Sequence, residues 1–244
     1  MVRVWSLSGN PSYEGVRQLQ LKLLELRAAD ECPDTLLFLE HSPVITRGRG
    51  LQYTGVARDR HMPLFVSPED PRFAGIEFAE SERGGDLTYH GPGQWILYPI
   101  CKLGGKGWTP FRDIEKFLRN LEQLVIDELT DRGLILSRKE NAAGVWVGDR
   151  KIASLGIAVK KWVTYHGVAL NCVNDLKPFS LISPCGFDSS VMTRLGDLLP
   201  LSPDWRIELE NSFLKRISAQ VGEPLQLKSL SLAQAQAICE IPSH

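Results

Sequence analysis

Two alternating apolar segments, separated by only two residues, constrain the fold of this chain more than any other feature. They run from Ile152 to Val159 and from Trp162 to Asn171, and both are rich in Val, Ile, Ala and Leu with short polar breaks. Such alternation is typical of β-strands, so we predict that both segments are strands of one sheet. A sheet holds side chains in fixed positions even when they are far apart in the sequence, so we expect a functional site in this region.

The residues at the two ends of this region suggest a nucleophile and a partner for it. Lys151 precedes the first strand, and Cys185 follows the second strand within the sequence S-P-C-G. Because Pro184 restricts the backbone and Gly186 permits a sharp bend, we predict that Cys185 lies at the tip of a loop. A nucleophile needs such an accessible position.

An ammonium group beside Cys185 would make its thiol reactive. An ordinary thiol has a pKa of about 8.5, and making it mostly ionised at neutral pH requires about 2.7 kcal/mol. A lysine about 4 Å away supplies roughly 4 kcal/mol of attraction at an effective dielectric constant of about 20, before desolvation. On this argument Lys151 alone is sufficient. The alternative is that Cys185 is a small buried apolar residue and that Lys151 is simply solvated.

The composition indicates one large soluble domain over residues 1–244. The chain is 43% hydrophobic and has a formal net charge of -1. It has no long apolar run and no secretory or transit pattern at its start, so we expect no membrane span and a cytoplasmic location. Five cysteines without a C-x-x-C pair agree with reduced thiols in that compartment. The near-zero net charge does not favour nucleic acid as a partner.

Further strands and helices are predicted on both sides of this region. The predicted strands are Arg3 to Leu7, Thr35 to Leu39, Val44 to Thr46, Trp95 to Ile100, and Val145 to Val147, which forms a hairpin with the strand beginning at Lys151. Helices are expected after Ser12, from Pro110 to Gly133, from Ser189 to Leu199, and after Ser202. The segment Leu51 to Ser81, with three prolines, is predicted to be a long loop.

A glycine-rich segment, R-G-G-D-L-T-Y-H-G-P-G-Q, extends from Arg83 to Gln94. Its four glycines and one proline allow the backbone to approach a ligand closely, and its polar side chains can contact that ligand. A glycine-rich hairpin explains the same composition equally well.

The sequence T-Y-H-G occurs in this segment and again at residues 164–167. The two copies place His90 and His166 where a strand meets a glycine turn, so both can face one cavity. A metal site made by these histidines and Cys185 is the other interpretation, but their spacing matches no standard zinc pattern. We therefore expect no metal.

Four motifs in order carry a resemblance to a known family. They are R-G-G-D-L-T-Y-H-G-P-G-Q at 83–94, K-I-A-S-L-G at 151–156, W-V-T-Y-H-G at 162–167 and S-P-C-G at 183–186. Together they resemble the lipoyl(octanoyl) transferases, which are octanoyl-[acyl-carrier-protein]:protein N-octanoyltransferases. The resemblance implies an α/β (α+β) fold, with a mixed β-sheet flanked by helices, similar to the catalytic domain of biotin and lipoate protein ligases.

The resemblance also implies an activity and a set of site residues. The activity is transfer of an octanoyl group from octanoyl-acyl carrier protein to a specific lysine of lipoyl domains, in 2-oxoacid dehydrogenase complexes and the glycine cleavage H protein, without ATP or a cofactor. Cys185 would carry the acyl group as a thioester, and Lys151 would lower the pKa of its thiol. The substrate-binding residues would be Arg83, Gly84, Gly85, Asp86, Leu87, Thr88, Tyr89, His90, Ser154, Leu155, Gly156, Gly167, Val168 and Ala169.

Three alternatives remain open from the sequence. An ATP-dependent lipoate or biotin protein ligase of the same fold would not need Cys185. A cysteine hydrolase would use Cys185 with His166 or His90 as base, oriented by Asp175 or Asn174. A binding module that recognises lipoyl domains or carrier proteins would need no reactive residue at all.

Overall fold

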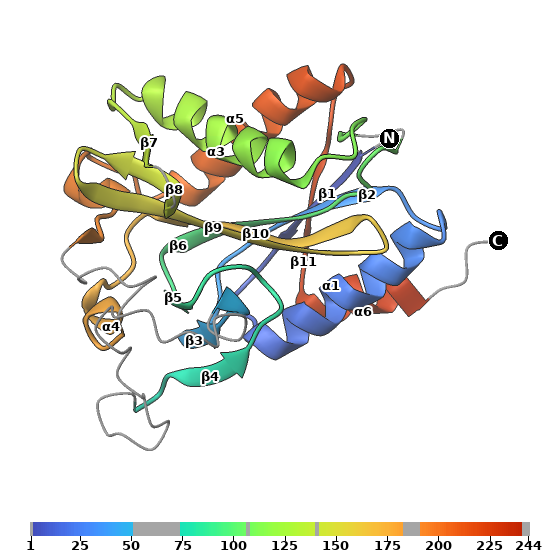
Figure 1. Ribbon diagram of the computed structural model, residues 1–244, viewed down its shortest axis with the longest axis horizontal. Helices are drawn as coiled ribbons and strands as arrows, with labels where there is room; N and C mark the ends of the chain where they lie inside the picture. The colour runs from blue at the N-terminus through green and yellow to red at the C-terminus, as the bar shows by residue number, and fades with distance from the viewer. Residues whose placement is uncertain (1, 51–73, 106–107, 140–141, 183–190, 241–244) are drawn as a thin grey trace.

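The computed structural model describes residues 2–50, 74–105, 108–139, 142–182 and 191–240. Within these residues the largest element is an eight-stranded mixed sheet (Figure 1). From one edge to the other its strands are β11 (Leu227–Leu230), β1 (Val2–Leu7), β2 (Asp34–Leu39), β6 (Gln94–Ile100), β10 (Val163–Asn171), β9 (Arg150–Lys160), β8 (Ala142–Val147) and β7 (Ser137–Lys139). A smaller sheet contains β4 (Glu77–Glu80), β3 (Val44–Arg47) and β5 (Leu87–His90). The predicted mixed sheet is confirmed.

The two alternating apolar segments are strands of one sheet, as predicted, and form the antiparallel hairpin of β9 and β10. Its two-residue turn consists of Lys161 and Trp162, whose φ angles are 53° and 61°. Positive φ at both positions is the geometry that matches the right-handed twist of two adjoining strands. The hairpin sets Gly156 opposite Gly167 near its middle.

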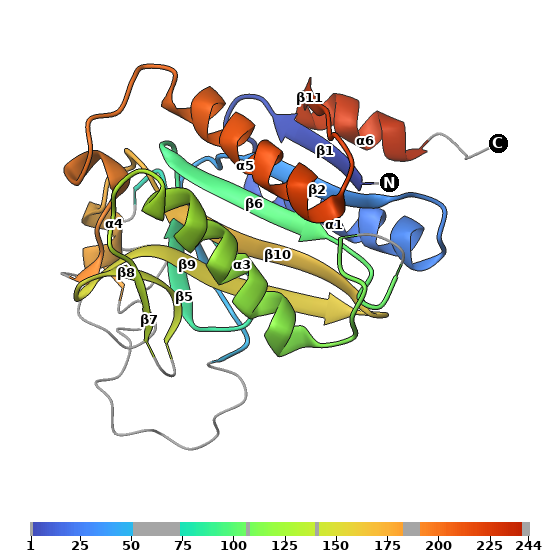
Figure 2. The same cartoon turned by 90° about the horizontal axis from the view of Figure 1, so that it is seen from above.

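Helices cover both faces of the large sheet (Figures 1 and 2). On one face lie α1 (Tyr13–Ala28) and α6 (Leu232–Glu240), which pack on one apolar cluster of the sheet. On the other face lie α3 (Ile114–Thr130) and α5 (Trp205–Val221), which pack on a second cluster. There the ring of Phe213 stacks on that of Trp95, with centroids 4.3 Å apart. As predicted, α1 begins after Ser12, whose hydroxyl accepts a hydrogen bond from the Gly15 amide.

Three predicted boundaries are wrong. Helix α3 begins at Ile114, later than Pro110, because the carboxylate of Asp113 accepts the Lys116 amide proton and caps the helix there. Strand β4 lies inside the segment predicted as a loop, because it pairs in parallel with β3. The rest of that segment, residues 51–73, lies outside the described residues.

The helix expected from Ser189 to Leu199 is the third error. Residues 189 and 190 lie outside the described residues, and the segment that follows contains only short helical turns, such as η4 (Leu195–Asp197). Met192 instead pairs with Lys151, and the Thr193 amide donates to the Lys151 carbonyl over 2.9 Å. These contacts extend the backbone and prevent a longer helix. No described helix is both long enough and apolar enough to cross a membrane.

A buried ion pair joins α1 to the start of β2. The Arg27 Nε donates to Asp34 Oδ1 over 2.6 Å, and the Asp34 side chain is only 1% exposed. The same carboxylate accepts the backbone amides of Lys102, over 3.0 Å, and Trp108, over 3.3 Å. One carboxylate therefore fixes a helix end, a strand start and the loop after β6.

We predict that Asp34→Ala lowers the free energy of unfolding by about 3–5 kcal/mol, because it leaves the buried Arg27 guanidinium with only the exposed carboxylate of Asp30 and removes the acceptor of two backbone amides. Glu80→Ala, which removes the exposed ion pair with Arg47, is the matched control and should cost less than about 1 kcal/mol. Urea denaturation of both variants measures the difference. Equal small losses would contradict the role given to Asp34.

Candidate functional site

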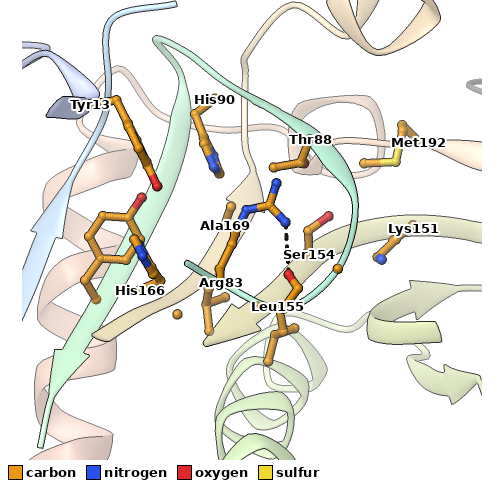
Figure 3. A pocket seen from close by; sticks show the side chains of 16 residues that line it. Tyr13, Arg83, Thr88, His90, Lys151, Ser154, Leu155, His166, Ala169 and Met192 are labelled. Carbon is orange, nitrogen blue, oxygen red and sulfur yellow. Dashed lines mark hydrogen bonds between the residues drawn. The ribbon is translucent and has the colours of Figure 1, made fainter. Parts of the chain in front are cut away.

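A cavity lies where β9 and β10 meet β5 and the loop of residues 83–86 (Figure 3). Its cavity volume is about 40 Å³, and the space reaches about 590 Å³ when the open solvent at its mouth is included. Its lining consists of Tyr13, Arg83, Gly84, Gly85, Thr88, His90, Tyr98, Lys151, Ser154, Leu155, Gly156, His166, Gly167, Val168, Ala169 and Met192. Most of these residues come from the four sequence motifs.

Glycines in β9 and β10 allow backbone to approach backbone here. A side chain at Gly156 would come within 2.9 Å of the Gly84 carbonyl oxygen. A side chain at Gly167 would overlap the carbonyl of Leu97 in β6. The loop of residues 83–86 can therefore lie directly over the hairpin, and the Gly84 amide donates to the Ile157 carbonyl over 3.0 Å.

Arg83 holds this loop in place through its own hydrogen bonds. Its guanidinium donates to the hydroxyl and the carbonyl of Thr46 in β3, over 2.8 Å each. It also donates to the carbonyls of Gly84, over 3.0 Å, and Asp86, over 2.8 Å. The side chain is 8% exposed. These contacts attach the loop to the small sheet and turn Gly84 and Gly85 towards the cavity.

Lys151 is buried at one end of the cavity, with 4% of its surface exposed. Its Nζ lies 5.6 Å from the centroid of the Trp146 ring. Its side chain occupies the space beside Gly144, where any Cβ would overlap Lys151 Cε. Gly144 is itself fixed, because its amide donates over 3.1 Å to Oε1 of the buried Glu122 in α3. α3 therefore fixes Gly144 in β8, and the absence of a side chain at Gly144 leaves room for Lys151.

Three buried histidines and two tyrosines form a ring cluster behind the other end of the cavity. The Tyr13 ring lies parallel to those of His90 and His166, with centroids 6.4 and 6.3 Å away. His41 Nδ1 donates to the Pro11 carbonyl over 3.1 Å, since a carbonyl only accepts, and its Nε2 then accepts from the Tyr98 hydroxyl over 3.1 Å.

Hydrogen bonds also determine the tautomer of His90. The Gln94 amide nitrogen donates to the Tyr89 carbonyl and to Asn171 Oδ1, so Gln94 Oε1 faces His90 as an acceptor. His90 Nδ1 therefore carries the proton and donates to that oxygen over 2.7 Å. Burial holds the pKa of His90 well below its ordinary value, so the ring is neutral and its Nε2 is an acceptor.

His166 has a strained backbone and an unusual side-chain environment. Its φ is 57°, a left-handed conformation that a non-glycine residue rarely adopts, and its amide donates to Gln20 over 2.7 Å. Its Nε2 lies 3.4 Å from the Glu82 carboxylate, which also pairs with Arg17. Burial lowers the pKa of His166 although Glu82 opposes this. The buried Nδ1 has no hydrogen-bond partner in the part of the chain that the structure describes.

A buried polar chain connects the two ends of the cavity. From His90 it passes through Gln94 to Asn171, whose Nδ2 donates to the Thr193 carbonyl over 3.0 Å. The Thr193 amide in turn donates to the Lys151 carbonyl over 2.9 Å. Two regions more than fifty residues apart in the sequence are thus held in fixed relation.

The structure brings most of the sequence-predicted residues to the cavity and turns some away from it. Lys151 and eleven of the expected substrate-binding residues line it, while Asp86, Leu87 and Tyr89 do not. In β5 the side chains alternate between faces, so Thr88 and His90 face the cavity, and Tyr89 packs edge-on against Phe179, 5.6 Å between centroids. Cys185 lies outside the described residues.

Three lining residues were absent from the prediction: Tyr13, Tyr98 and Met192. Each comes from an element whose sequence shows only ordinary core periodicity. Tyr13 is the first residue of α1, and Tyr98 lies within β6. No local signal distinguishes them, because contacts between distant segments bring them to the cavity: α1 packs on β10, β6 pairs with β10, and Met192 pairs with Lys151.

Comparisons with known proteins agree with the four motifs. Residues 13–213 match the model of the lipoyl protein ligase A/B catalytic domain. The octanoyltransferase of Syntrophobacter fumaroxidans is 44% identical over 191 residues, 78% of this chain and 78% of that protein. The octanoyltransferase of Caldicellulosiruptor saccharolyticus is 44% identical over 189 residues, 77% of this chain and 75% of that protein.

Solved structures share the fold at low sequence identity. A lipoate-protein ligase A bound with ATP has a TM-score of 0.69 and 17% identity, covering 98% of this chain and 95% of that one. An archaeal system from Thermoplasma acidophilum, containing a bipartite lipoate protein ligase and its E2 lipoyl domain, gives a TM-score of 0.66 at 16% identity, covering 98% and 92%. The expected similarity to the lipoate ligase fold is confirmed.

We predict that the stability of the protein falls in mild acid, in part through His41. Burial lowers the pKa of His41 from 6.5 to about 4. In the interval between these values the unfolded chain binds a proton that the folded protein does not, so the free energy of unfolding falls as the pH drops. His41→Gln should remove up to about 1.4 kcal/mol of this loss per pH unit. Urea denaturation at about pH 6.5 and about pH 5 tests this; parallel pH profiles would contradict it.

Proposed function

Since this chain belongs to the octanoyltransferase family of acyltransferases, we propose that residues 1–244 form one catalytic domain that transfers an octanoyl group from octanoyl-acyl carrier protein to a lysine of a lipoyl domain. The acceptors are the lipoyl domains of 2-oxoacid dehydrogenase complexes and the H protein of glycine cleavage. The reaction needs no nucleotide, cofactor or metal, and it takes place in the cytoplasm.

In the first step the Cys185 thiolate attacks the thioester carbonyl of the carrier protein. A bond forms between its Sγ and the acyl carbon, and the bond from that carbon to the pantetheine sulfur breaks. The Lys151 ammonium, which stabilises the Cys185 thiolate, gives its proton to the departing thiolate. The acyl group is then a thioester of the enzyme, and Lys151 is neutral.

In the second step the amine of the lipoyl-domain lysine attacks this thioester. The new amide bond forms as the bond to Cys185 Sγ breaks, and neutral Lys151 takes the proton that the amine loses. Both residues return to their starting charge states. One lysine thus acts as acid in the first half and as base in the second.

The observation that carries this proposal is the position of Lys151 in the cavity. A lysine with 4% exposure lies at one end of a cavity most of whose other lining residues come from the four motifs. A partly desolvated ammonium loses its proton more easily than a solvated one, as the second step requires.

We predict a single octanoyl adduct on the protein after incubation with octanoyl-acyl carrier protein and no nucleotide, measured by intact-mass spectrometry. Cys185→Ala should form no adduct, and Lys151→Met should form it about thirtyfold more slowly, because only about 3% of an ordinary thiol is ionised at neutral pH. An apo lipoyl domain should discharge the adduct. Acylation that appears only with free octanoate and ATP would contradict this proposal and indicate a ligase.

We also predict that Gly144→Ala reduces octanoyl transfer by about tenfold to a hundredfold, because its new methyl group must displace the Lys151 side chain. Gly148→Ala is the matched control. Gly148 also has a positive φ, 56°, but nothing lies within 4 Å of its Cβ position, so this variant should cost about 1 kcal/mol in stability and keep its activity. Equal transfer rates for the two variants would show that Gly144 does not position Lys151.

A further inference from the structure

Two lysines share one aromatic ring beside the cavity. Lys151 lies directly opposite Trp146 where β9 pairs with β8, so both side chains point to the same side of the sheet. Lys139, the last residue of β7, also reaches the Trp146 ring. The centroid of that ring lies 4.4 Å from Lys139 Nζ and 5.6 Å from Lys151 Nζ, so the two nitrogens are at most about 10 Å apart.

The two ammonium groups differ in their access to water. Lys151 is 4% exposed, whereas 35% of the Lys139 side chain is exposed. At the other end of the cavity Tyr13 and His166 are each 1% exposed (Figure 3). Lys139 therefore presents a positive charge to solvent close to Lys151, on the side away from the closed end.

We propose that Lys139 binds the phosphate of the pantetheine arm that carries the octanoyl group. The inference rests on the proposed function, in which the thioester of the carrier protein lies beside Lys151. In that arm about thirteen bonds separate the sulfur from the phosphorus, a distance of about 16 Å at the ~3.6 Å per three bonds of a fully extended chain. The Lys139 ammonium lies within this reach, and a lysine attracts phosphate oxygens as a compact positive charge.

The carboxylate that now contacts Lys139 is replaceable. Lys139 Nζ donates to Asp149 Oδ1 over 2.8 Å, and the Asp149 side chain is 99% exposed. An exposed ion pair of this kind favours its paired state by less than about fivefold. The Trp146 ring attracts the ammonium whichever anion faces it. A phosphodiester, which also carries one negative charge, can therefore take the place of the carboxylate.

The neighbouring arginines are less suited to this task than Lys139. The Arg138 guanidinium donates to two side chains and a backbone carbonyl. The Arg194 guanidinium donates to one carboxylate and two backbone carbonyls. Arg150 directly precedes Lys151 in β9, so its side chain leaves the strand on the opposite face.

Substrates with and without the phosphate test this inference. Octanoyl-acyl carrier protein, octanoyl-phosphopantetheine and octanoyl-pantetheine are each mixed with the protein, and intact-mass spectrometry gives the second-order rate constant of adduct formation. The wild-type protein should prefer octanoyl-phosphopantetheine to octanoyl-pantetheine by about fivefold. Lys139→Met, which removes only the charge, should lower the rate constants of both phosphate-bearing substrates about fivefold and change that of octanoyl-pantetheine by less than about twofold. Lys139→Arg should restore the preference.

A second variant should act in the opposite direction. Asp149→Asn removes the carboxylate that competes with the phosphate, so it should raise the rate constants of the phosphate-bearing substrates about twofold to fivefold. Lys160→Met is the matched control, because Lys160 is also an exposed lysine paired with a carboxylate, that of Glu25, but lies at the far end of β9. It should change no rate constant by more than about twofold.

The outcomes distinguish this inference from the proposed function. Equal losses for all three substrates in Lys139→Met would indicate damage to the site, and a preference lost in Arg150→Met instead would assign the phosphate to the other face of β9. A loss confined to the carrier protein, or reaction of the carrier protein alone, would indicate contacts with its protein surface. Equal rate constants for the two small thioesters in the wild-type protein would mean that the phosphate is not bound. Each of these results overturns the inference and leaves octanoyl transfer intact, whereas no wild-type adduct from any substrate would overturn the proposed function and the inference with it.

Discussion

Antiparallel pairing of β9 with β10 sets Gly156 opposite Gly167, and the absence of side chains at both residues lets neighbouring backbone lie directly against the hairpin. The loop of residues 83–86 lies over Gly156, and β6 passes beside Gly167. Every lining group is therefore placed relative to one strand pair. A shift of this pair by one residue would turn the lining side chains to the opposite face of the sheet.

The site also depends on buried polar groups that fix one another. Gln94 and Asn171 have amide orientations that their hydrogen bonds determine, and they link His90 to the backbone beside Lys151. Buried polar groups of this kind are stable only when their partners are in place. Arg83 likewise fixes the loop of residues 83–86, because its guanidinium donates hydrogen bonds to the carbonyl and the hydroxyl of Thr46. Several residues that line the cavity therefore also hold its walls in place.

Local sequence patterns predict individual strands and helices. They do not predict features that depend on contacts between segments far apart in the sequence. The alternation in β9 and β10 and the cap at Ser12 were sufficient to predict two strands of one sheet and a helix. The strand β4 was missed because its charged and half-exposed residues form a strand only through β3. Motif spacing placed Lys151 and the glycines at one site, but it could not show that Tyr89 points away, which depends on the phase of β5. The position of Cys185 remains a prediction.

The pairing of β1 with β11 has a consequence for synthesis of the chain. β1 is synthesised more than two hundred residues before its outer neighbour, because Val4 pairs with Leu227. Until then the main-chain groups along this edge of β1 have no strand beside them, and such an edge can pair with other chains. Contacts between the two ends of a chain also slow folding, because the loop between them must close first. Aggregation of the nascent protein should therefore begin at β1, and a chaperone that covers this strand would raise the yield of folded protein.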